Sequence, residues 1–247
     1  MARILILSSL VAASPVGGYA QARLLSGHEV ALAPTVLFGR HPGLGAPGGG
    51  AVSPQMLSGV LEGIFAAWDR IDAVLTGYFA APEQVLLAAA ALDQACEGGR
   101  TPVRIVDPIL GDSDTGPYVR PGVEEALRAH LLSRADILTP NAWEAERLTG
   151  VPAGDPDGAR AAIGVLGMPC LISSVRRDGR IGAVFGDRSQ AWYAHTHESP
   201  AHLRGAGDRL AAGLVSALLE GCTVSDLAAR AVETVALDGA AVLSQPL

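Results

Sequence analysis

The sequence predicts an α/β fold, with a mainly parallel sheet covered by helices on both faces. Short apolar runs that suit buried strands alternate with longer helix-forming segments along most of the chain. The chain has 247 residues, of which 49% are hydrophobic and 17% charged, as in a globular protein with a large core. We find no internal repeat and no domain boundary. We therefore expect residues 1–247 to form a single domain.

Predicted strands and helices alternate through the first half of the chain. Its strands are short apolar runs, and the segments between them are rich in Ala, Leu and Gln, which favour helices. Gly17-Gly18 suits the loop between the first strand and the first helix. In order, the expected elements are a strand at 4–7, a helix at 20–26, strands at 28–33 and 35–38, a helix at 54–68, a strand at 73–76, a helix at 82–96 and a strand at 103–106.

The second half continues the pattern and then departs from it. Two alternating runs separated by Gly186-Asp187 predict a β-hairpin, which is antiparallel. In order, the expected elements are a helix at 123–132, a strand at 136–138, helices at 142–148 and 157–166, a strand at 170–173, the hairpin of 181–185 and 189–194, and helices that begin near 208 and 224.

One segment lacks any periodic pattern. Residues 40–50 contain two prolines and five glycines, so they do not suit a helix or a long strand. Loops of this length within a compact domain are often functional. We expect a mobile flap here that closes over a bound ligand.

Charge and composition exclude several classes of protein. With 18 basic and 25 acidic residues the net charge is −7, which argues against nucleic acid and acidic membranes as partners. Every basic residue is an arginine. The absence of lysine excludes a Walker-type lysine and a side-chain Schiff base. The three cysteines show no metal-ligand or disulfide spacing, which favours reduced thiols and a cytoplasmic location.

The strongest candidate for chemistry is the glycine-bounded stretch Gly205-Ala206-Gly207, followed by Asp208 and a long apolar run. The run predicts a helix, and free N–H groups at a helix start form an anion site. An aspartate beside an anion site is a candidate base for a hydroxyl that attacks a phosphate. The alternative is an aspartate that only complements the helix dipole.

Polar residues also follow the predicted strands, at the sheet edge where α/β proteins bind ligands. They are Ser8, Ser9, Thr76, Tyr78, Asp107, Asp112, Thr139, Asn141, Ser173 and Ser174. Turn formation is the alternative explanation for each. Asn141 and Glu144 also have the spacing of a capping box. Asp107 follows a buried strand and needs a cation or donors. With Asp112 and Glu144 it would suit a hydrated Mg²⁺.

Five motifs, in order, resemble those of pyridoxal kinases in the ribokinase-like superfamily. The resemblance extends from about residue 4 to 219. Residues 106–112 (VDPILGD) resemble the family's Asp-Pro-Val-Met-Gly-Asp motif, and 139–146 (TPNAWEAE) its Thr-Pro-Asn-x-x-Glu segment. Residues 205–208 (GAGD) are similar to the superfamily signature, while 35–42 (TVLFGRHP) and 76–78 (TGY) look like segments around the substrate. The resemblance implies a three-layer ribokinase-like fold.

The resemblance also implies roles for individual residues. Asp208 would deprotonate the 5′-hydroxymethyl group of a vitamin B6 substrate, and Gly205, Ala206 and Gly207 would form the anion hole. Mg²⁺ and ATP are the implied cofactors, with K⁺ as a monovalent cation, and a homodimer is the implied assembly. The other implied contacts are Asp107, Asn141, Glu144 and Ser173 for ATP and its phosphates; Asp107, Asp112 and Glu144 for metal; and Ser9, Val16, Thr35 and Tyr78 for the vitamin.

Two departures leave alternatives open. Gly17-Gly18 stands where the family often has Gly-Asn, and Arg209 follows the predicted base where a neutral residue is usual. A kinase for another hydroxymethyl heterocycle, such as hydroxymethylpyrimidine, is one alternative. A non-catalytic member that binds vitamin or nucleotide is another. A zinc site at His195 and His197 has little support, because histidines on exposed strands are ordinary.

Overall fold

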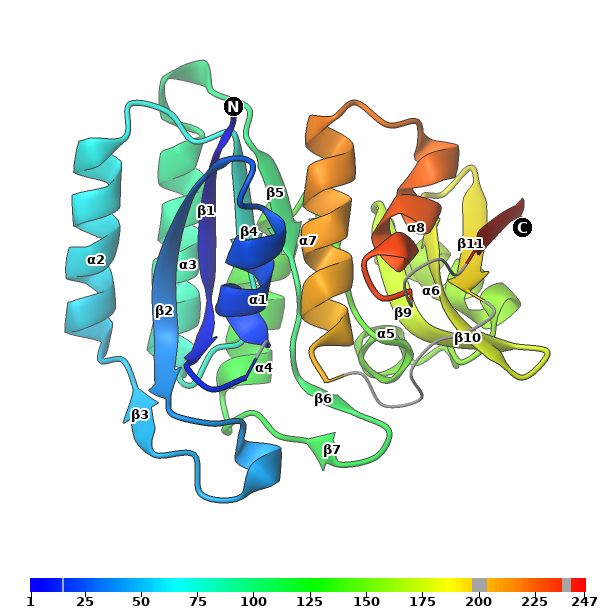
Figure 1. The fold of residues 1–247 in the computed structure, drawn as a ribbon, viewed down its shortest axis with the longest axis horizontal. Helices are drawn as coiled ribbons and strands as arrows, with labels where there is room; N and C mark the ends of the chain where they lie inside the picture. The colour runs from blue at the N-terminus through cyan, green and yellow to red at the C-terminus, as the bar shows by residue number, and fades with distance from the viewer. Residues whose placement is uncertain (15, 197–203, 237–240) are drawn as a thin grey trace. The chain divides into compact units, whose positions relative to one another are not determined.

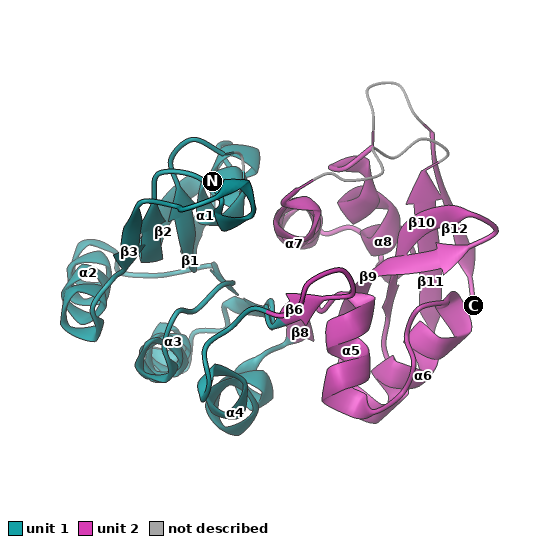
Figure 2. Cartoon of the chain, turned by 90° about the horizontal axis from the view of Figure 1, so that it is seen from below, with its two compact units in different colours: residues 1–110, 118–136 teal, residues 111–117, 137–247 magenta. Residues whose placement is uncertain are grey.

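A computed structural model describes residues 1–14, 16–196, 204–236 and 241–247 (Figure 1). His197, which the zinc alternative requires, lies outside the described residues. The backbone divides into two compact units (Figure 2). Unit 1 consists of residues 1–110 and 118–136, and unit 2 of residues 111–117 and 137–247. The expectation of a single domain over residues 1–247 stays a prediction.

Unit 1 is built on strands in the order β3-β2-β1-β4-β5. β2, β1, β4 and β5 are parallel to their neighbours, and β3 is antiparallel to β2. The α1 helix covers one face, and α2, α3 and α4 cover the other (Figure 2). The bounds are β1 Arg3–Val11, α1 Gly17–Leu24, β2 Glu29–Phe38, β3 Gly49–Ala51, α2 Pro54–Ala67, β4 Ala73–Thr76, α3 Pro82–Ala95, β5 Val103–Val106 and α4 Val123–Ala126.

Unit 2 carries strands in the order β8-β9-β10-β11-β12. The β8–β9 pair is parallel and the pairs that follow are antiparallel. The helices α7 and α8 lie on one face, and α5 and α6 on the other (Figure 2). The bounds are β6 Gly111–Asp112, β7 Gly116–Pro117, β8 Ile137–Leu138, α5 Ala142–Thr149, α6 Pro156–Leu166, β9 Cys170–Arg177, β10 Arg180–Gly186, β11 Ala191–Thr196, α7 Ala206–Leu219, α8 Val224–Glu233 and β12 Val242–Pro246.

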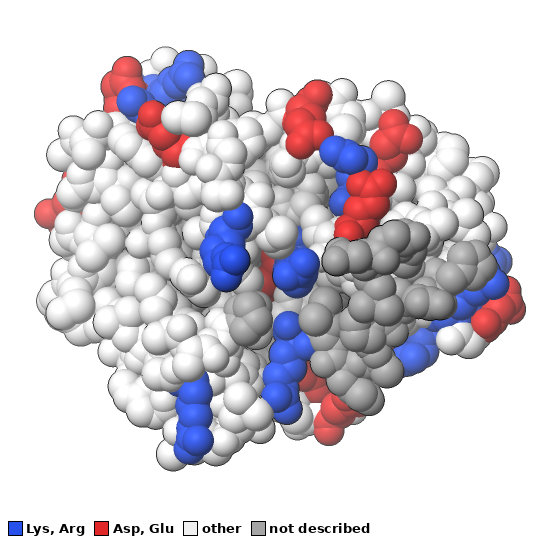
Figure 3. Space-filling model, viewed as in Figure 1, with Lys and Arg blue, Asp and Glu red and all other residues white. Residues whose placement is uncertain are grey.

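The cores explain why the apolar runs become strands. Residues 4–7 of β1 are fully buried, as expected for a parallel strand with helices on both faces. The same holds for β4, whose apolar side chains are fully buried. On the face shown in Figure 3, much of the surface of unit 1 carries no charged side chain. The predicted α/β fold is confirmed.

Several element boundaries differ from the predictions. The two strands expected at 28–33 and 35–38 are one strand, β2, because Pro34 lies where the pairing with β1 shifts register. Proline has no backbone N–H and cannot donate a hydrogen bond to the neighbouring strand. It is therefore tolerated at such an irregularity in the pairing. The helix expected at 123–132 is α-helical only as far as Ala126 and continues as a wider π-type turn over Leu127–Leu131.

The segment at 40–50 is partly structured. It contains the short 3₁₀ turn Pro42–Leu44, and its glycine-rich end pairs with β2 as β3. Arg40 Nε donates to the carbonyl of Ala46 at 2.8 Å. Its mobility stays a prediction. Within the described residues, no helix combines the length and the apolar character that a membrane crossing requires.

Candidate active site

The start of α7 has the geometry of an anion site. Gly205 precedes the helix with φ 74° and ψ 18°, a left-handed conformation that glycine adopts without strain. Ala206, Gly207 and Asp208 form the first turn, and the first return bond to Gly205 comes from the amide of Arg209 at 3.1 Å. The preceding amides therefore lie at the positive end of the helix, where N–H groups lack intrahelical acceptors.

Asp208 lies in this first turn and is partly exposed. Its carboxylate belongs to the same helix start as the amides of the predicted anion hole. The structure thus brings together all four predicted residues of the Gly205–Asp208 stretch. The arrangement suits a base held beside a phosphate, and it also suits a carboxylate that complements the helix dipole.

Asn141 and Glu144 form a complete capping box at the start of α5. The amide of Glu144 donates to Asn141 Oδ1 at 2.9 Å, and the amide of Asn141 donates to Glu144 Oε2 at 2.8 Å. Both side chains also hold Gly111. Asn141 Nδ2 donates to its carbonyl at 2.8 Å, and its amide donates to Glu144 Oε1 at 3.3 Å. The predicted cap is present, and it fixes the base of the β6–β7 hairpin.

Asp112 has a structural set of partners in that hairpin. Its Oδ1 accepts hydrogen bonds from the amide of Asp114 at 3.0 Å, and from the amide and hydroxyl of Thr115, both at 2.7 Å. Partial burial acts to raise the pKa of Asp112, but the hydrogen bonds from Thr115 and Asp114 bring it below its usual value. A metal-binding role for Asp112 stays a prediction.

Ser173 and Ser174 lie at an irregularity in β9. Ser173 is 7% exposed, and its amide donates to the carbonyl of Pro140 at 3.0 Å. Ser174 is exposed and has a positive φ of 62°, at the point where the β9–β10 register shifts. Bulges of this kind redirect side chains and occur next to active sites. Ser173, predicted to touch phosphate, is thus the buried member of the pair.

Thr139 follows β8 and carries a buried hydroxyl. The residue is 6% exposed, and its Oγ1 has no hydrogen-bond partner among the described residues. A buried oxygen without a partner costs free energy unless a donor or a cation satisfies it. Sequence reasoning placed Thr139 at the sheet edge without giving it a role.

Asp107 is a buried carboxylate of unit 1. It follows β5 directly, and only 4% of its surface is exposed. Its amide donates to the carbonyl of Thr76 at 3.2 Å, which continues the β4–β5 ladder by one residue. Among the described residues, no three His, Cys, Asp or Glu side chains form a metal-binding cluster.

Gly17-Gly18 has a packing explanation. Gly17 has φ 64°, and a Cβ there would lie 2.1 Å from Ser9 Oγ. A Cβ on Gly18 would lie 2.4 Å from Leu32 Cδ1. Both glycines therefore let the start of α1 approach β1 and β2 closely. Val16, which precedes α1, is 6% exposed.

Thr35 and Tyr78 are joined directly. Thr35 is fully buried, and its Oγ1 donates to the carbonyl of Tyr78 at 2.5 Å. Burial raises the pKa of the Tyr78 phenol, and the positive charge of Arg120 opposes this. The predicted substrate residue Thr35 thus supports the Tyr78 loop with its hydroxyl.

Gln84 was not found by sequence reasoning. It is fully buried in α3 and contacts the same two segments. The sequence does not predict the role of Gln84, because glutamine is common in helices and two of the hydrogen-bond partners of this one lie far away in the sequence.

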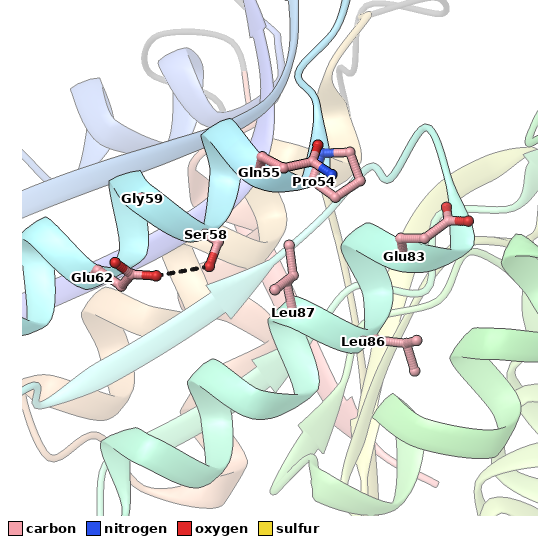
Figure 4. A pocket seen from close by; sticks show the side chains of 8 residues that line it. All are labelled: Pro54, Gln55, Ser58, Gly59, Glu62, Glu83, Leu86 and Leu87. Carbon is pink, nitrogen blue, oxygen red and sulfur yellow. Dashed lines mark hydrogen bonds between the residues drawn. The ribbon is translucent and has the colours of Figure 1, made fainter.

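A groove of about 610 Å³ opens between α2 and α3 (Figure 4). Its lining includes Gln55, Ser58, Glu83 and Leu86 and contains none of the predicted site residues. The predicted chemistry is therefore not located in this groove.

The α/β fold and the glycine-bounded start of α7 with its aspartate define a small-molecule kinase of the ribokinase-like class. The model of the phosphomethylpyrimidine kinase family matches residues 49–237, more than half of the chain. The pyridoxal kinase PdxY of Corynebacterium diphtheriae is 31% identical over 85% of this chain and 77% of its own length. The pyridoxine/pyridoxal/pyridoxamine kinase of Bordetella pertussis is 34% identical over 83% and 76%.

A solved structure agrees with these relatives. The pyridoxal kinase of Leishmania donovani in complex with ADP superimposes with a TM-score of 0.83 at 26% identity, covering 93% of this chain and 83% of that one. This chain belongs to the pyridoxal kinase family.

Proposed function

We propose that this protein transfers the γ-phosphoryl group of ATP to the 5′-hydroxymethyl group of pyridoxal, pyridoxine or pyridoxamine, as in vitamin B6 salvage. The observation that carries the proposal is the start of α7, where Gly205 sets a left-handed turn and Asp208 lies in the first helical turn. The family relationship supports the choice of vitamin and nucleotide, because the relatives are named for these vitamers and one solved member holds ADP.

Asp208 would accept the proton of the substrate hydroxyl. Phosphoryl transfer has a loose transition state, so positioning and charge neutralisation contribute more than early proton removal. A carboxylate is a weak base in the ground state, yet it accepts the proton late, as the attacking oxygen becomes acidic on bonding to phosphorus. The amides of Gly205, Ala206 and Gly207 would stabilise the negative charge on the transferred group without reorganisation.

Asp107 and Glu144 would hold the Mg²⁺ that accompanies ATP, and Asn141 and Ser173 would contact the nucleotide. Mg²⁺ favours one or two carboxylates plus water and phosphate oxygens, so a dense cluster of ligands is not required. When bound, it supplies charge neutralisation at the phosphates. The unpartnered Thr139 Oγ1 in unit 2 fits an oxygen ligand of a monovalent cation such as K⁺.

Ser9, Val16, Thr35 and Tyr78 would form the vitamin side of the site. Thr35 would help to position Tyr78, since its hydroxyl donates a hydrogen bond to the Tyr78 carbonyl. A phenol is protonated at neutral pH, and burial, which raises the pKa of Tyr78, favours this form further, so Tyr78 can donate a hydrogen bond. The 40–50 flap would close over the bound vitamin and exclude water. We also propose a cytoplasmic homodimer.

Phosphorylation of a hydroxymethylpyrimidine is the second candidate function. It is favoured by the description of the matching family model, phosphomethylpyrimidine kinase. A non-catalytic role has lost its support, because packing against Ser9 and Leu32 accounts for Gly17-Gly18, and a bond to Thr234 accounts for Arg209.

A coupled ADP-release assay tests the proposal. Purified protein is supplied with Mg·ATP and, in turn, with pyridoxal, pyridoxine, pyridoxamine or hydroxymethylpyrimidine. We expect the highest kcat/KM with a B6 vitamer. Exclusive turnover of the pyrimidine would establish the second candidate, and no ADP release with any of the four would refute a kinase function. Size-exclusion chromatography tests the homodimer.

A further inference from the structure

The side chain of Gln84 connects three segments of unit 1. Gln84 lies in the first turn of α3 and is fully buried. Its Oε1 accepts a hydrogen bond from the amide of Ala80 at 2.8 Å. Its Nε2 donates to the carbonyls of Thr35 and Val52, both at 2.8 Å. One amide thus holds β2, the junction between β3 and α2, and the loop between β4 and α3.

These segments carry the residues assigned to the vitamin. Thr35 belongs to β2, and Tyr78 to the loop that Gln84 holds at Ala80. Thr35 Oγ1 donates to the Tyr78 carbonyl at 2.5 Å, and the Thr35 carbonyl also accepts the amide of Val52 at 2.9 Å. Val52 directly follows β3, the strand in which the glycine-rich segment ends. The Gln84 network therefore links both vitamin segments to the C-terminal base of the flap.

The chemistry of the position requires an amide. Ala80 presents a buried donor, whereas Thr35 and Val52 present carbonyl acceptors, and only a group that accepts and donates satisfies all three. An apolar side chain would leave a buried donor and a buried acceptor without partners. A carboxylate would face two carbonyl oxygens. Glutamine has the length that spans these groups from the first turn of α3.

We infer that Gln84 is a positioning residue for the vitamin site, which fixes the Tyr78 loop relative to Thr35. The inference rests on the proposed function, since it assigns these two segments to the vitamin. Gln84 acts through the backbone of both segments and does not itself contact the reacting atoms. Its loss should weaken vitamin binding selectively, because the residues proposed for phosphate transfer at the start of α7 belong to unit 2.

Gln84→Met tests this inference, because methionine keeps the length and removes both donors and the acceptor. Gln84→Asn is the second variant, with an amide one methylene too short. Leu92→Val is the matched control, since Leu92 is a fully buried residue of α3 that makes none of these hydrogen bonds. Steady-state kinetics are measured with pyridoxal and ATP varied separately, after circular dichroism has confirmed folding.

We expect the KM for pyridoxal to rise about tenfold in both Gln84 variants, with a KM for ATP within about twofold of wild type. Leu92→Val should lower the melting temperature and leave both KM values unchanged. In a folded Gln84 variant, an unchanged KM for pyridoxal, or an equal rise in the KM for ATP, would overturn this inference. The proposed function would still stand. If neither variant folds, the amide serves the fold, which also overturns the inference. A wild-type protein inactive toward B6 vitamers would instead refute the proposed function, and with it this inference.

Discussion

Arg209 Nε donates to the carbonyl oxygen of Thr234 at 2.7 Å, and Thr234 Oγ1 donates back to the carbonyl of Arg209 at 3.0 Å. Arg209 directly follows the first turn of α7, and Thr234 is the C-cap residue of α8. The charged side chain therefore complements the C-terminal end of α8, where backbone carbonyls lack helical partners. This accounts for an arginine directly after the predicted base.

Arg209→Leu should reduce stability more than catalysis. Loss of the bond to Thr234 should lower the free energy of unfolding by about 1 kcal/mol. We expect kcat to stay within about threefold of wild type, since the transferred phosphate does not require this side chain. Urea unfolding and the ADP-release assay measure the two effects. Thr234→Val, which removes the returning hydroxyl, should behave in the same way. A hundredfold fall in kcat at unchanged stability would instead place Arg209 at the phosphate.

Glu144 combines a structural and a proposed chemical role, and a matched variant separates them. Glu144→Ala should lower the free energy of unfolding by about 1 kcal/mol through loss of the cap. It should also raise the KM for Mg·ATP at least about tenfold, since a proposed cation ligand is removed. Asp155→Ala removes the cap of α6, where Asp155 accepts the amide of Gly158 at 2.9 Å, and serves as the control.

The outcome is read from the two variants together. The Asp155 variant should lose stability and keep the KM for Mg·ATP. Retention of that KM in the Glu144 variant as well would reduce Glu144 to a capping residue.

Cys170 provides a prediction that depends on pH. Burial raises the pKa of its thiol to about 12, opposed only in part by a backbone hydrogen bond. The thiol should therefore resist iodoacetamide in the native state at pH 8, while the partly exposed Cys96 and Cys222 react. Peptide mass spectrometry identifies the modified sites. Rapid modification of Cys170 without unfolding would contradict its burial.

The raised pKa of Cys170 also makes the free energy of unfolding depend on pH. The unfolded thiol ionises near pH ~8.5, whereas the folded thiol keeps its proton to about pH 12. The protonated thiol of Cys170 therefore contributes fully to the free energy of unfolding below the pKa of the unfolded protein. This contribution is lost as the pH rises from that value toward the pKa of the folded protein. Between pH 8 and about 10, the wild type should lose more stability than Cys170→Ala, as thermal melts at each pH would show.

Local sequence signals located most of the fold. The short strand-forming runs at 73–76 and 103–106 became β4 and β5 with the predicted bounds, because polar or turn-forming residues follow each run. The cap at Asn141 was readable from its spacing to Glu144. By contrast, β12 was missed, because a mostly exposed edge strand has no apolar run to mark it.

The site was less accessible to sequence reasoning wherever partners are distant in the chain. Asp208 and its glycines are contiguous, so their common helix start could be predicted. The partner of Arg209 lies 25 residues away, and Gln84 bonds a carbonyl 49 residues away. Nothing in the local sequence distinguishes such an arginine or glutamine from a solvated one.

Asp208→Asn tests the central assignment. Asparagine keeps the shape of the side chain and the glycine-bounded helix start, but it removes the acceptor for the substrate proton. Loss of a general base typically costs about 10²–10⁴-fold in rate. We expect kcat to fall at least about 100-fold, with a melting temperature close to wild type, because asparagine keeps the volume of this partly exposed side chain.

Binding should respond differently from turnover in this variant. The substitution acts mainly on the transition state, so the KM for pyridoxal should change little. The affinity for ATP should rise or stay constant, because a negative charge near the γ-phosphate is removed. Single-turnover kinetics with isothermal titration of ATP separates the two effects. Asp226→Asn, in the first turn of α8, is the matched control for loss of a dipole-complementing carboxylate. Turnover at a third of the wild-type rate would mean that Asp208 only complements the dipole of α7.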